Sequence, residues 1–177
     1  MEKTPATAND WMLPILAEFQ PRLQRYALRL LPGHDDLAAD AVQHAFQKLA
    51  SVEQRDDIQQ LGPWLYAVCR NRAFDELRRL GRTTQWTNES EAMMSTTSAP
   101  AEKLVTDQDC QSFLQTLIDG LPGSQREALD LWSGGMSYAE ISQIMSRTEG
   151  NIRVLVHRGL EQLRRHPEVT RWLASDP

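Results

Sequence analysis

Two amphipathic patterns separated by a short break stand out between residues 121 and 165. The first follows Ser137, which stands three residues before Glu140 at the spacing of a capping box, a reciprocal pair of hydrogen bonds that starts a helix. The second follows Thr148, a residue type that caps helix starts. Apolar residues recur at helical spacing in both patterns; they are Ile141, Ile144 and Met145, then Ile152, Val156, Leu160 and Leu163. A short capped helix, a tight turn and a longer helix predict a DNA-reading helix-turn-helix.

Helical spacing also dominates the first 82 residues. Pro14 and Pro21 each suit the first turn of a helix, which predicts a short helix and then a second one from about Pro21 to Gly33. Asp35 or Asp36 is expected to cap a third helix, and Pro63 to open a fourth. Their predicted inner faces are Leu37, Ala41, Ala45, Phe46 and Leu49, then Leu65, Cys69, Ala73, Leu77 and Leu80. The polar residues 51–60 between these two helices predict a loop.

Residues 83–101 differ from the rest because they are rich in Ser, Thr, Asn and Glu and poor in large apolar groups. Such a composition predicts a flexible linker, and residues 83–112 carry five acids against one lysine. Further helices are expected at about 102–119 and 124–132. The sequence therefore predicts an all-α protein of two small helical domains, residues 1–82 and 102–177, joined by a flexible acidic linker at 83–101.

Charge adds a functional hint to this architecture. The chain of 177 residues has a net charge of −5, yet residues 64–82 and 147–165 each hold five Arg against two acids, a local charge of +3. Basic patches on two helices of an acidic protein favour phosphate-facing surfaces.

No apolar run is long enough to span a bilayer and no signal peptide opens the sequence, so we expect a cytoplasmic protein. The two cysteines and four histidines lack ligand spacing, so no metal or other cofactor is expected.

The order of these motifs resembles the extracytoplasmic-function (ECF) sigma factors of bacterial RNA polymerase, within the principal sigma family. LAADAVQHAFQKL is similar to the core-binding helix of the family's region 2, with Asp40 and Gln43 on its acid–x–x–glutamine positions. PWLYAVCRNRAFDELRR resembles the promoter-reading helix that follows, and residues 121–165 resemble region 4. The resemblance spans nearly the whole chain in the right order.

This resemblance implies a sigma factor that binds the polymerase core, directs it to specific promoters and helps to open the DNA. It implies core contacts on the third predicted helix, at Asp40, Gln43, His44 and Gln47. Contacts to the downstream promoter element are implied for Asn71, Asp75, Arg78 and Arg79. Contacts to the upstream element are implied for Thr148, Asn151, Arg153, His157 and Arg158. The implied partners are core polymerase, promoter DNA and an anti-sigma factor, with no small-molecule substrate and no catalytic residue, since the polymerase performs the chemistry.

The sequence departs from the family pattern at five positions. Ala39 stands where an acid is usual, and Ser146 and Arg147 stand in the turn where glycine and an apolar residue are preferred. Val154 and Leu155 occupy reading-helix positions often held by Ser and Arg.

Two alternative functions remain open from the sequence: a stand-alone helix-turn-helix regulator, and a helical enzyme or metal protein. The second lacks a nucleophile–base pair, a glycine-rich phosphate loop and a ligand cluster.

Overall fold

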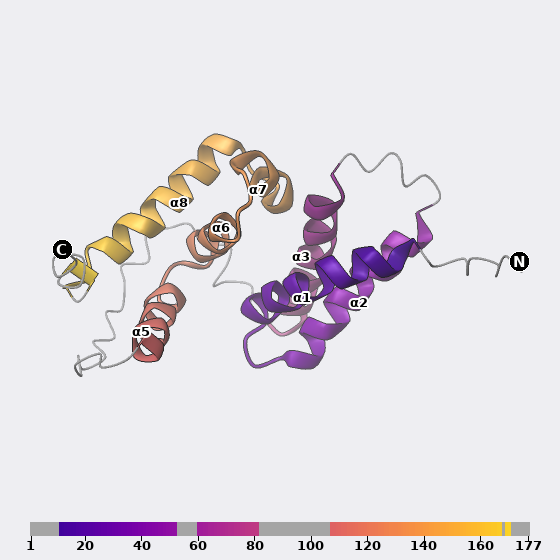
Figure 1. Ribbon diagram of the computed structural model, residues 1–177, viewed down its shortest axis with the longest axis horizontal. Helices are drawn as coiled ribbons and strands as arrows, with labels where there is room; N and C mark the ends of the chain where they lie inside the picture. Colours follow the sequence, from indigo (N-terminus) through magenta and orange to yellow (C-terminus); the bar gives the residue numbers. More distant parts are fainter. Residues whose placement is uncertain (1–10, 53–59, 82–106, 168, 171–177) are drawn as a thin grey trace, which may run out of the picture. The chain divides into compact units, whose positions relative to one another are not determined.

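The computed structural model describes residues 11–52, 60–81, 107–167 and 169–170, with the backbone alone for 107–112. These residues contain seven helices and no strand, so the predicted all-α class is confirmed (Figure 1). The chain divides after Thr83 into two compact units, and each is treated by itself below. Unit 1 contains α1, α2 and α3, and unit 2 contains α5 to α8.

Unit 1 is a bundle of three helices: α1 (Met12–Leu30), α2 (Asp35–Ser51) and α3 (Leu61–Arg79), each packed on the other two. Their facing sides bury an apolar core of mostly small and branched side chains. Its members include Leu23, Ala27, Leu30, Ala41, Ala45, Leu49, Leu65, Cys69, Ala73 and Leu77. The rings of Tyr26 and Tyr66 join α1 to α3 with their centroids 5.1 Å apart. Nearly all of the predicted inner faces of α2 and α3 therefore lie in the core.

The predicted break before Pro21 is wrong, because α1 continues through that residue. A proline inside a helix lacks one backbone hydrogen bond and usually costs about 3 kcal/mol. Here the helix carries Leu23, Tyr26 and Leu30 into the core immediately after the proline. Burial of each such side chain contributes about 1.5–3 kcal/mol, which offsets the local cost. Tertiary packing thus overrides a local helix-breaking signal.

Two other local predictions are also wrong. The residue that precedes α2 is His34, while Asp35 and Asp36 lie in the first turn, where their charges favour the positive end of the helix dipole. Leu80, expected on the inner face of α3, is 41% exposed. It lies just beyond the end of the helix, where Gly81 turns the chain with a φ of 68°. The leucine therefore leaves the helical face on which the pattern placed it.

Unit 2 consists of α5 (Asp107–Asp119), α6 (Gly123–Ser133), α7 (Tyr138–Met145) and α8 (Glu149–Arg164). Helices α6, α7 and α8 pack on one another around a second apolar core. It includes Leu121, Ala128, Leu129, Leu131, Ile141, Ile144, Met145, Ile152, Leu155 and Val156. Leu160 and Leu163 of the predicted stripe are only half-buried. The pair α7 and α8 with its short connection is the predicted helix-turn-helix.

The ends of α7 and α8 are fixed by the side chains that the sequence indicated. Ser137 and Glu140 form the full capping box: the Ser137 backbone N–H donates to the Glu140 carboxylate over 2.8 Å, and the Glu140 N–H donates to the serine oxygen over 3.3 Å. Thr148 accepts from the backbone N–H of Asn151 at the start of α8. Between them Ser146 adopts the left-handed conformation, with a φ of 54°. A strained serine therefore makes the turn at a position that usually favours glycine.

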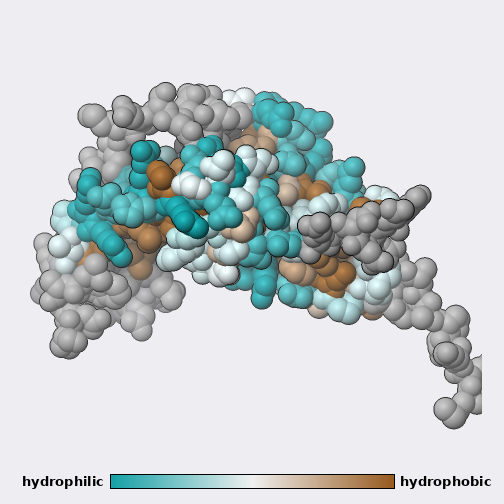
Figure 2. Space-filling view, turned by 90° about the horizontal axis from the view of Figure 1, so that it is seen from above, coloured by the Kyte–Doolittle hydropathy of each residue, from teal (hydrophilic) through white to brown (hydrophobic). Residues whose placement is uncertain are grey.

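The predicted linker at 83–101 and most of the predicted loop at 51–60 lie outside the described residues. Within the described part of the chain, no helix combines the length and the apolar character needed to cross a membrane. Figure 2 shows one face, on which hydrophobic residues reach the described surface in small areas interrupted by hydrophilic ones. Among the described residues, the exposed large apolar side chains are Leu13, Leu80, Trp132 and Val154.

Candidate nucleic-acid interface

The outer side of α2 carries the four residues that the sequence suggested for protein binding. Asp40, Gln43 and Gln47 are exposed and His44 is half-buried. Their spacing of three and four residues places them on one face of the helix. The opposite face, with Ala38, Ala41, Ala45 and Leu49, is buried against the rest of unit 1. The α2 face is therefore a polar surface on a rigid support.

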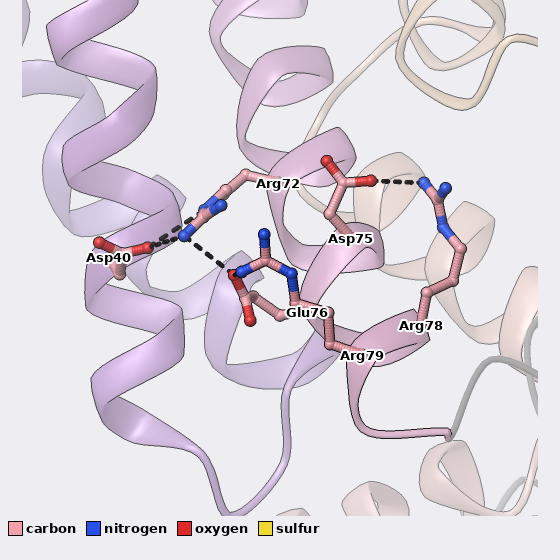
Figure 3. A network of polar contacts seen from close by, with 6 residues as sticks. All are labelled: Asp40, Arg72, Asp75, Glu76, Arg78 and Arg79. Carbon is pink, nitrogen blue, oxygen red and sulfur yellow. Dashed lines mark hydrogen bonds and ion pairs between the residues drawn. The ribbon is translucent and has the colours of Figure 1, made fainter.

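Asp40 is also joined to α3 across the bundle. The Arg72 guanidinium donates from Nε and Nη2 to Asp40 Oδ2, over 3.1 and 2.7 Å (Figure 3). Both hydrogen bonds end on the same carboxylate oxygen, and the Asp40 side chain is 49% exposed. The hydrogen bond that Arg72 donates to Asp40 raises the pKa of Arg72 above its ordinary value, and the negative charge of Glu76 acts in the same direction. Arg72 thus ties the α2 face to the basic helix.

Glu76 is the inner member of this network. Its side chain is 8% exposed, and its Oε1 lies 2.9 Å from Arg72 Nη2 and 3.2 Å from Arg79 Nη1. A buried carboxylate without a cationic partner is strongly unfavourable, so the two arginines satisfy a requirement of the fold. Figure 3 shows the chain of ion pairs from Asp40 through Arg72 and Glu76 to Arg79.

The four residues suggested for the downstream DNA contact all lie exposed along α3. They are Asn71, Asp75, Arg78 and Arg79. Asp75 accepts from Arg78 over 2.6 Å, a local pairing at helical spacing. Arg70 stacks over the Phe74 ring, with the guanidinium carbon 4.3 Å from the centroid. This side of α3 therefore presents cations whose orientations are set by neighbouring carboxylates and by an aromatic ring.

Helix α8 carries the five residues suggested for the upstream DNA contact. Thr148, Arg153, His157 and Arg158 are exposed, and Asn151 is half-buried. The Asn151 side-chain oxygen accepts from Arg147 Nη1 over 3.3 Å, at the turn that precedes the helix. Leu155 is buried in the core of unit 2, at 5% exposure, so one of the two apolar departures in this helix is structural. The other, Val154, is exposed.

The two candidate arginines of α8 differ in their surroundings. Arg153 Nη2 lies 3.5 Å from Glu149 Oε2, and its guanidinium carbon is 5.4 Å from the centroid of the Tyr138 ring on α7. Arg158 is exposed and has no hydrogen bond or ion pair with any other described residue. Arg153 is therefore directed along the N-terminal part of α8, whereas Arg158 is unrestrained.

Metal or thiol chemistry finds no support among the described side chains. No three of their His, Cys, Asp and Glu residues gather into a group that would hold a metal ion. Burial raises the pKa of the Cys69 thiol to about 12, so this cysteine stays protonated at neutral pH. Its place between the helices of unit 1 makes it part of the core.

Two positions in this interface escaped the sequence analysis. The spacing of four residues is enough to predict the pairing of Arg72 with Glu76. The contact of Arg72 with Asp40 joins residues 32 positions apart, and the spacing does not predict it. Tyr138, which lies beneath Arg153, carried no signal beyond its place in the short helix. Contacts between helices depend on how the helices pack, and one sequence does not specify that packing directly.

Comparisons with known proteins agree with this architecture. A family model described as Sigma-70 region 2 matches residues 15–83, and one described as Sigma-70, region 4 matches residues 114–163. ECF RNA polymerase sigma factor SigE of Mycolicibacterium smegmatis is 28% identical over 165 residues, 90% of this chain and 64% of that relative. RNA polymerase sigma factor CarQ of Myxococcus xanthus is 27% identical over 168 residues, 93% of each chain.

A solved structure is similar over almost the whole chain as well. It is the sigma factor RpoE of Bartonella quintana, crystallised in complex with the anti-sigma factor NepR. The similarity covers 96% of this chain and all of that one, at 26% identity and a TM-score of 0.64. The two family models fall on unit 1 and unit 2 in the order that the sequence motifs indicated.

Proposed function

The chain belongs to the sigma-70 family, in its ECF group, and from this we propose how its described helices carry out the family's task. A sigma factor directs RNA polymerase core to promoters and so sets where transcription starts. The alternative of a stand-alone helix-turn-helix regulator is not favoured, because a region 2 unit precedes the helix-turn-helix in the same chain. That pairing of units is the observation that carries the function.

Unit 1 binds the polymerase core through the outer face of α2. Asp40, Gln43, His44 and Gln47 provide carboxylate, amide and imidazole groups along one side of a helix whose other side is buried. The same unit recognises the downstream promoter element through Asn71, Arg78 and Arg79 of α3, with Asp75 holding Arg78 in place. The hydrogen bond from Arg72 to Asp40 joins these two proposed surfaces directly, so a side-chain contact links the α2 face to α3.

Unit 2 places α8 in the major groove of the upstream element. Its exposed Arg and His side chains, the Asn151 amide and the capped N-terminus suit a helix that enters DNA by its first turns. Arg153 and Asn151 lie nearer that end and are proposed to contact bases, whereas Arg158 grips phosphate at the groove edge. Residues 83–101 connect the two functions as an acidic linker.

The partners follow from these surfaces and from the relatives. We expect the chain to bind core polymerase and promoter DNA in the cytoplasm, and to be held inactive by an anti-sigma factor, as the complex of the Bartonella quintana protein suggests. No cofactor and no catalytic side chain is required, since the polymerase forms the phosphodiester bonds. The acidic net charge and two patches of +3 favour weak DNA binding by the free chain.

The test is reconstitution with purified core polymerase, followed by sequencing of the transcripts that the holoenzyme starts on genomic DNA. We expect transcripts from a small set of specific start sites. Core polymerase alone should not produce them, and the Gln43→Ala, Gln47→Ala double variant should produce fewer. Gln20→Ala, at an exposed position of α1, serves as the matched control. Tight sequence-specific DNA binding by the free chain, without any polymerase-dependent start sites, would overturn the proposal and favour the regulator.

A further inference from the structure

The outward face of α8 carries an exposed valine. Val154 is 45% exposed, whereas its neighbour Leu155 is 5% exposed and belongs to the core of unit 2. Most exposed neighbours of Val154 on this helix are polar or charged, including Arg153, His157 and Arg158. An isolated exposed valine needs no explanation on an ordinary surface. On a helix proposed to enter a DNA groove, its position around the axis decides what it meets.

The buried stripe of α8 fixes which direction points away from the core. Ile152, Leu155, Val156 and Gly159 form that stripe. At about 100° per residue, Val154 and His157 lie within about 30° of the direction opposite its centre. Arg153 and Arg158 lie about 70° away from that direction on its two sides. The valine is therefore near the middle of the outward face, and the two arginines flank it.

Gly150 lies one turn before Val154, close to the centre of the same face. A Cβ atom built on Gly150 meets no other atom within 4 Å, so packing inside the protein does not require glycine there. Glycine is unfavourable within a helix but allows another molecule to approach the backbone closely. The outward face of α8 thus has an open backbone position followed by a small apolar side chain, with a cation on either side.

We propose that Val154 reads the upstream promoter element by packing against the 5-methyl group of a thymine in the major groove. This inference rests on the proposed function, because it needs α8 to enter the groove. The thymine methyl is the apolar group that the major groove displays, and small apolar side chains contact it. Arg153 and Arg158 then reach toward the two sides of the groove, while Gly150 lets the start of the helix sit close to the base edges. Arg or Ser at position 154 would instead seek a hydrogen-bonding base edge.

The experiment uses the holoenzyme and a promoter identified by transcript sequencing. Each thymine of the upstream element is replaced in turn by deoxyuridine, which removes only the methyl group, and holoenzyme affinity is measured by competition. We expect one position, or two adjacent ones, at which the wild type loses about fourfold, the factor that corresponds to one buried methyl group. The Val154→Ala holoenzyme should have a lower affinity for the thymine promoter, and its affinity should not change when deoxyuridine replaces thymine at that position. Val154→Thr keeps a methyl group in place and should retain the sensitivity.

Leu13→Ala is the matched control, because it truncates an exposed apolar side chain in unit 1 and should leave the deoxyuridine profile unchanged. Parallel profiles for the wild type and Val154→Ala would overturn the inference. So would equal losses on all promoters together with weaker core binding, since a protein would then cover the valine. If transcription remains promoter-specific in either case, the proposed function stands and only the thymine contact fails.

Gly150→Ala gives a second, independent measurement. The added methyl group meets nothing within the protein and improves helix propensity, so thermal stability should stay equal or rise. Holoenzyme affinity for the promoter should fall severalfold, because the methyl group would occupy the space of the approaching base edges. Unchanged affinity with unchanged stability would overturn the close approach of this face to DNA.

Discussion

The basic segments 64–82 and 147–165 carry the same local charge, but the helices within them, α3 and α8, are built into their units in different ways. On α3, Arg72 and Arg79 converge on the buried carboxylate of Glu76, and Arg72 also crosses to Asp40 on α2. On α8, the ion pairs of Arg153 and Arg165 join exposed side chains four residues apart on one helix. The charges of α3 therefore help to hold unit 1 together, whereas those of α8 are mounted on a helix fixed by caps and apolar packing.

This difference has a functional consequence. Under the proposed function, a substitution in the α3 network should change the proposed polymerase-binding face, the proposed DNA-binding face and the stability of the unit together, because one set of hydrogen bonds joins them. A substitution on the outward face of α8 should then change the proposed DNA contacts alone. We therefore expect specificity for the upstream element to vary at little structural cost, and the proposed downstream contacts on α3 to be constrained by the fold of unit 1.

The largest effect expected from this comparison is on Arg72. Arg72→Met keeps the length of the side chain but removes the cation that pairs with both Asp40 and the buried Glu76, and it leaves Glu76 with Arg79. Breaking a fully buried pair costs about 3–5 kcal/mol, and partial exposure of Arg72 reduces the expected loss of unfolding free energy to about 2–3 kcal/mol. Urea unfolding followed by circular dichroism measures it.

Arg78→Met is the matched control, because among the described residues Arg78 forms an ion pair only with the exposed Asp75 on the same helix. Such surface pairs contribute about 0–1 kcal/mol, so little change is expected. Equal losses from the two variants would show that the α3 network is no more structural than an ordinary surface pair.

The next effect separates the two arginines of α8 by role. Arg153→Ala should cost about 1–3 kcal/mol on the preferred upstream element and relax its sequence preference, as for a good base contact. Arg158→Ala should weaken binding to all sequences alike and reduce the salt slope by about 1, as for a phosphate contact. Transcription from promoter variants by each mutant holoenzyme, with a salt titration, measures both. Equal and sequence-independent losses would mean that phosphates alone place the helix.

The helices and caps of unit 2 followed from the sequence because their causes are local. The capping box of Ser137 and Glu140 and the cap at Thr148 involve residues three positions apart, and the structure contains both. Periodicity likewise identified the buried sides of α2 and α3. Where a local signal competed with packing, packing decided the outcome, as at Pro21 inside α1.

The candidate interface was only partly readable for the same reason. Residue type and spacing indicated the exposed polar faces of α2, α3 and α8, but their proposed contacts with polymerase and DNA remain predictions. The bond between Arg72 and Asp40 depends on the packing of α2 against α3, and helical periodicity does not specify it. Leu155 and Val154 looked equivalent in sequence, and only the packing of α8 separates the buried residue from the exposed one.

A smaller effect concerns the caps that hold the reading helix pair. Ser137→Ala should lower the unfolding free energy of unit 2 by about 1 kcal/mol at neutral pH. Hydrogen bonds from the Ser137 side chain and backbone lower the pKa of Glu140. The ionised Glu140 carboxylate therefore stabilises the folded state at pH values above its ordinary pKa. This contribution to the unfolding free energy is lost as the pH falls through the lowered pKa of the folded state. Ser137→Ala should flatten that pH dependence in urea unfolding, whereas Ser133→Ala, at another exposed helix end, should leave it intact.

The smallest effect is a gain at the turn between α7 and α8. Unit 1 already has glycine at its described left-handed positions, Gly33 and Gly81, whereas unit 2 has Ser146 at the helix-turn-helix turn. A residue with a Cβ is strained in this conformation by about 1 kcal/mol or more. Glycine removes that strain, but it also raises the conformational entropy of the unfolded chain, which offsets part of the gain. Ser146→Gly should therefore raise the unfolding free energy by about 0.5 kcal/mol, measured as an increased urea midpoint. Ser146→Ala keeps the strain and should bring no gain. If alanine stabilises as much as glycine, the serine hydroxyl is the unfavourable group, and the backbone of the turn is not strained.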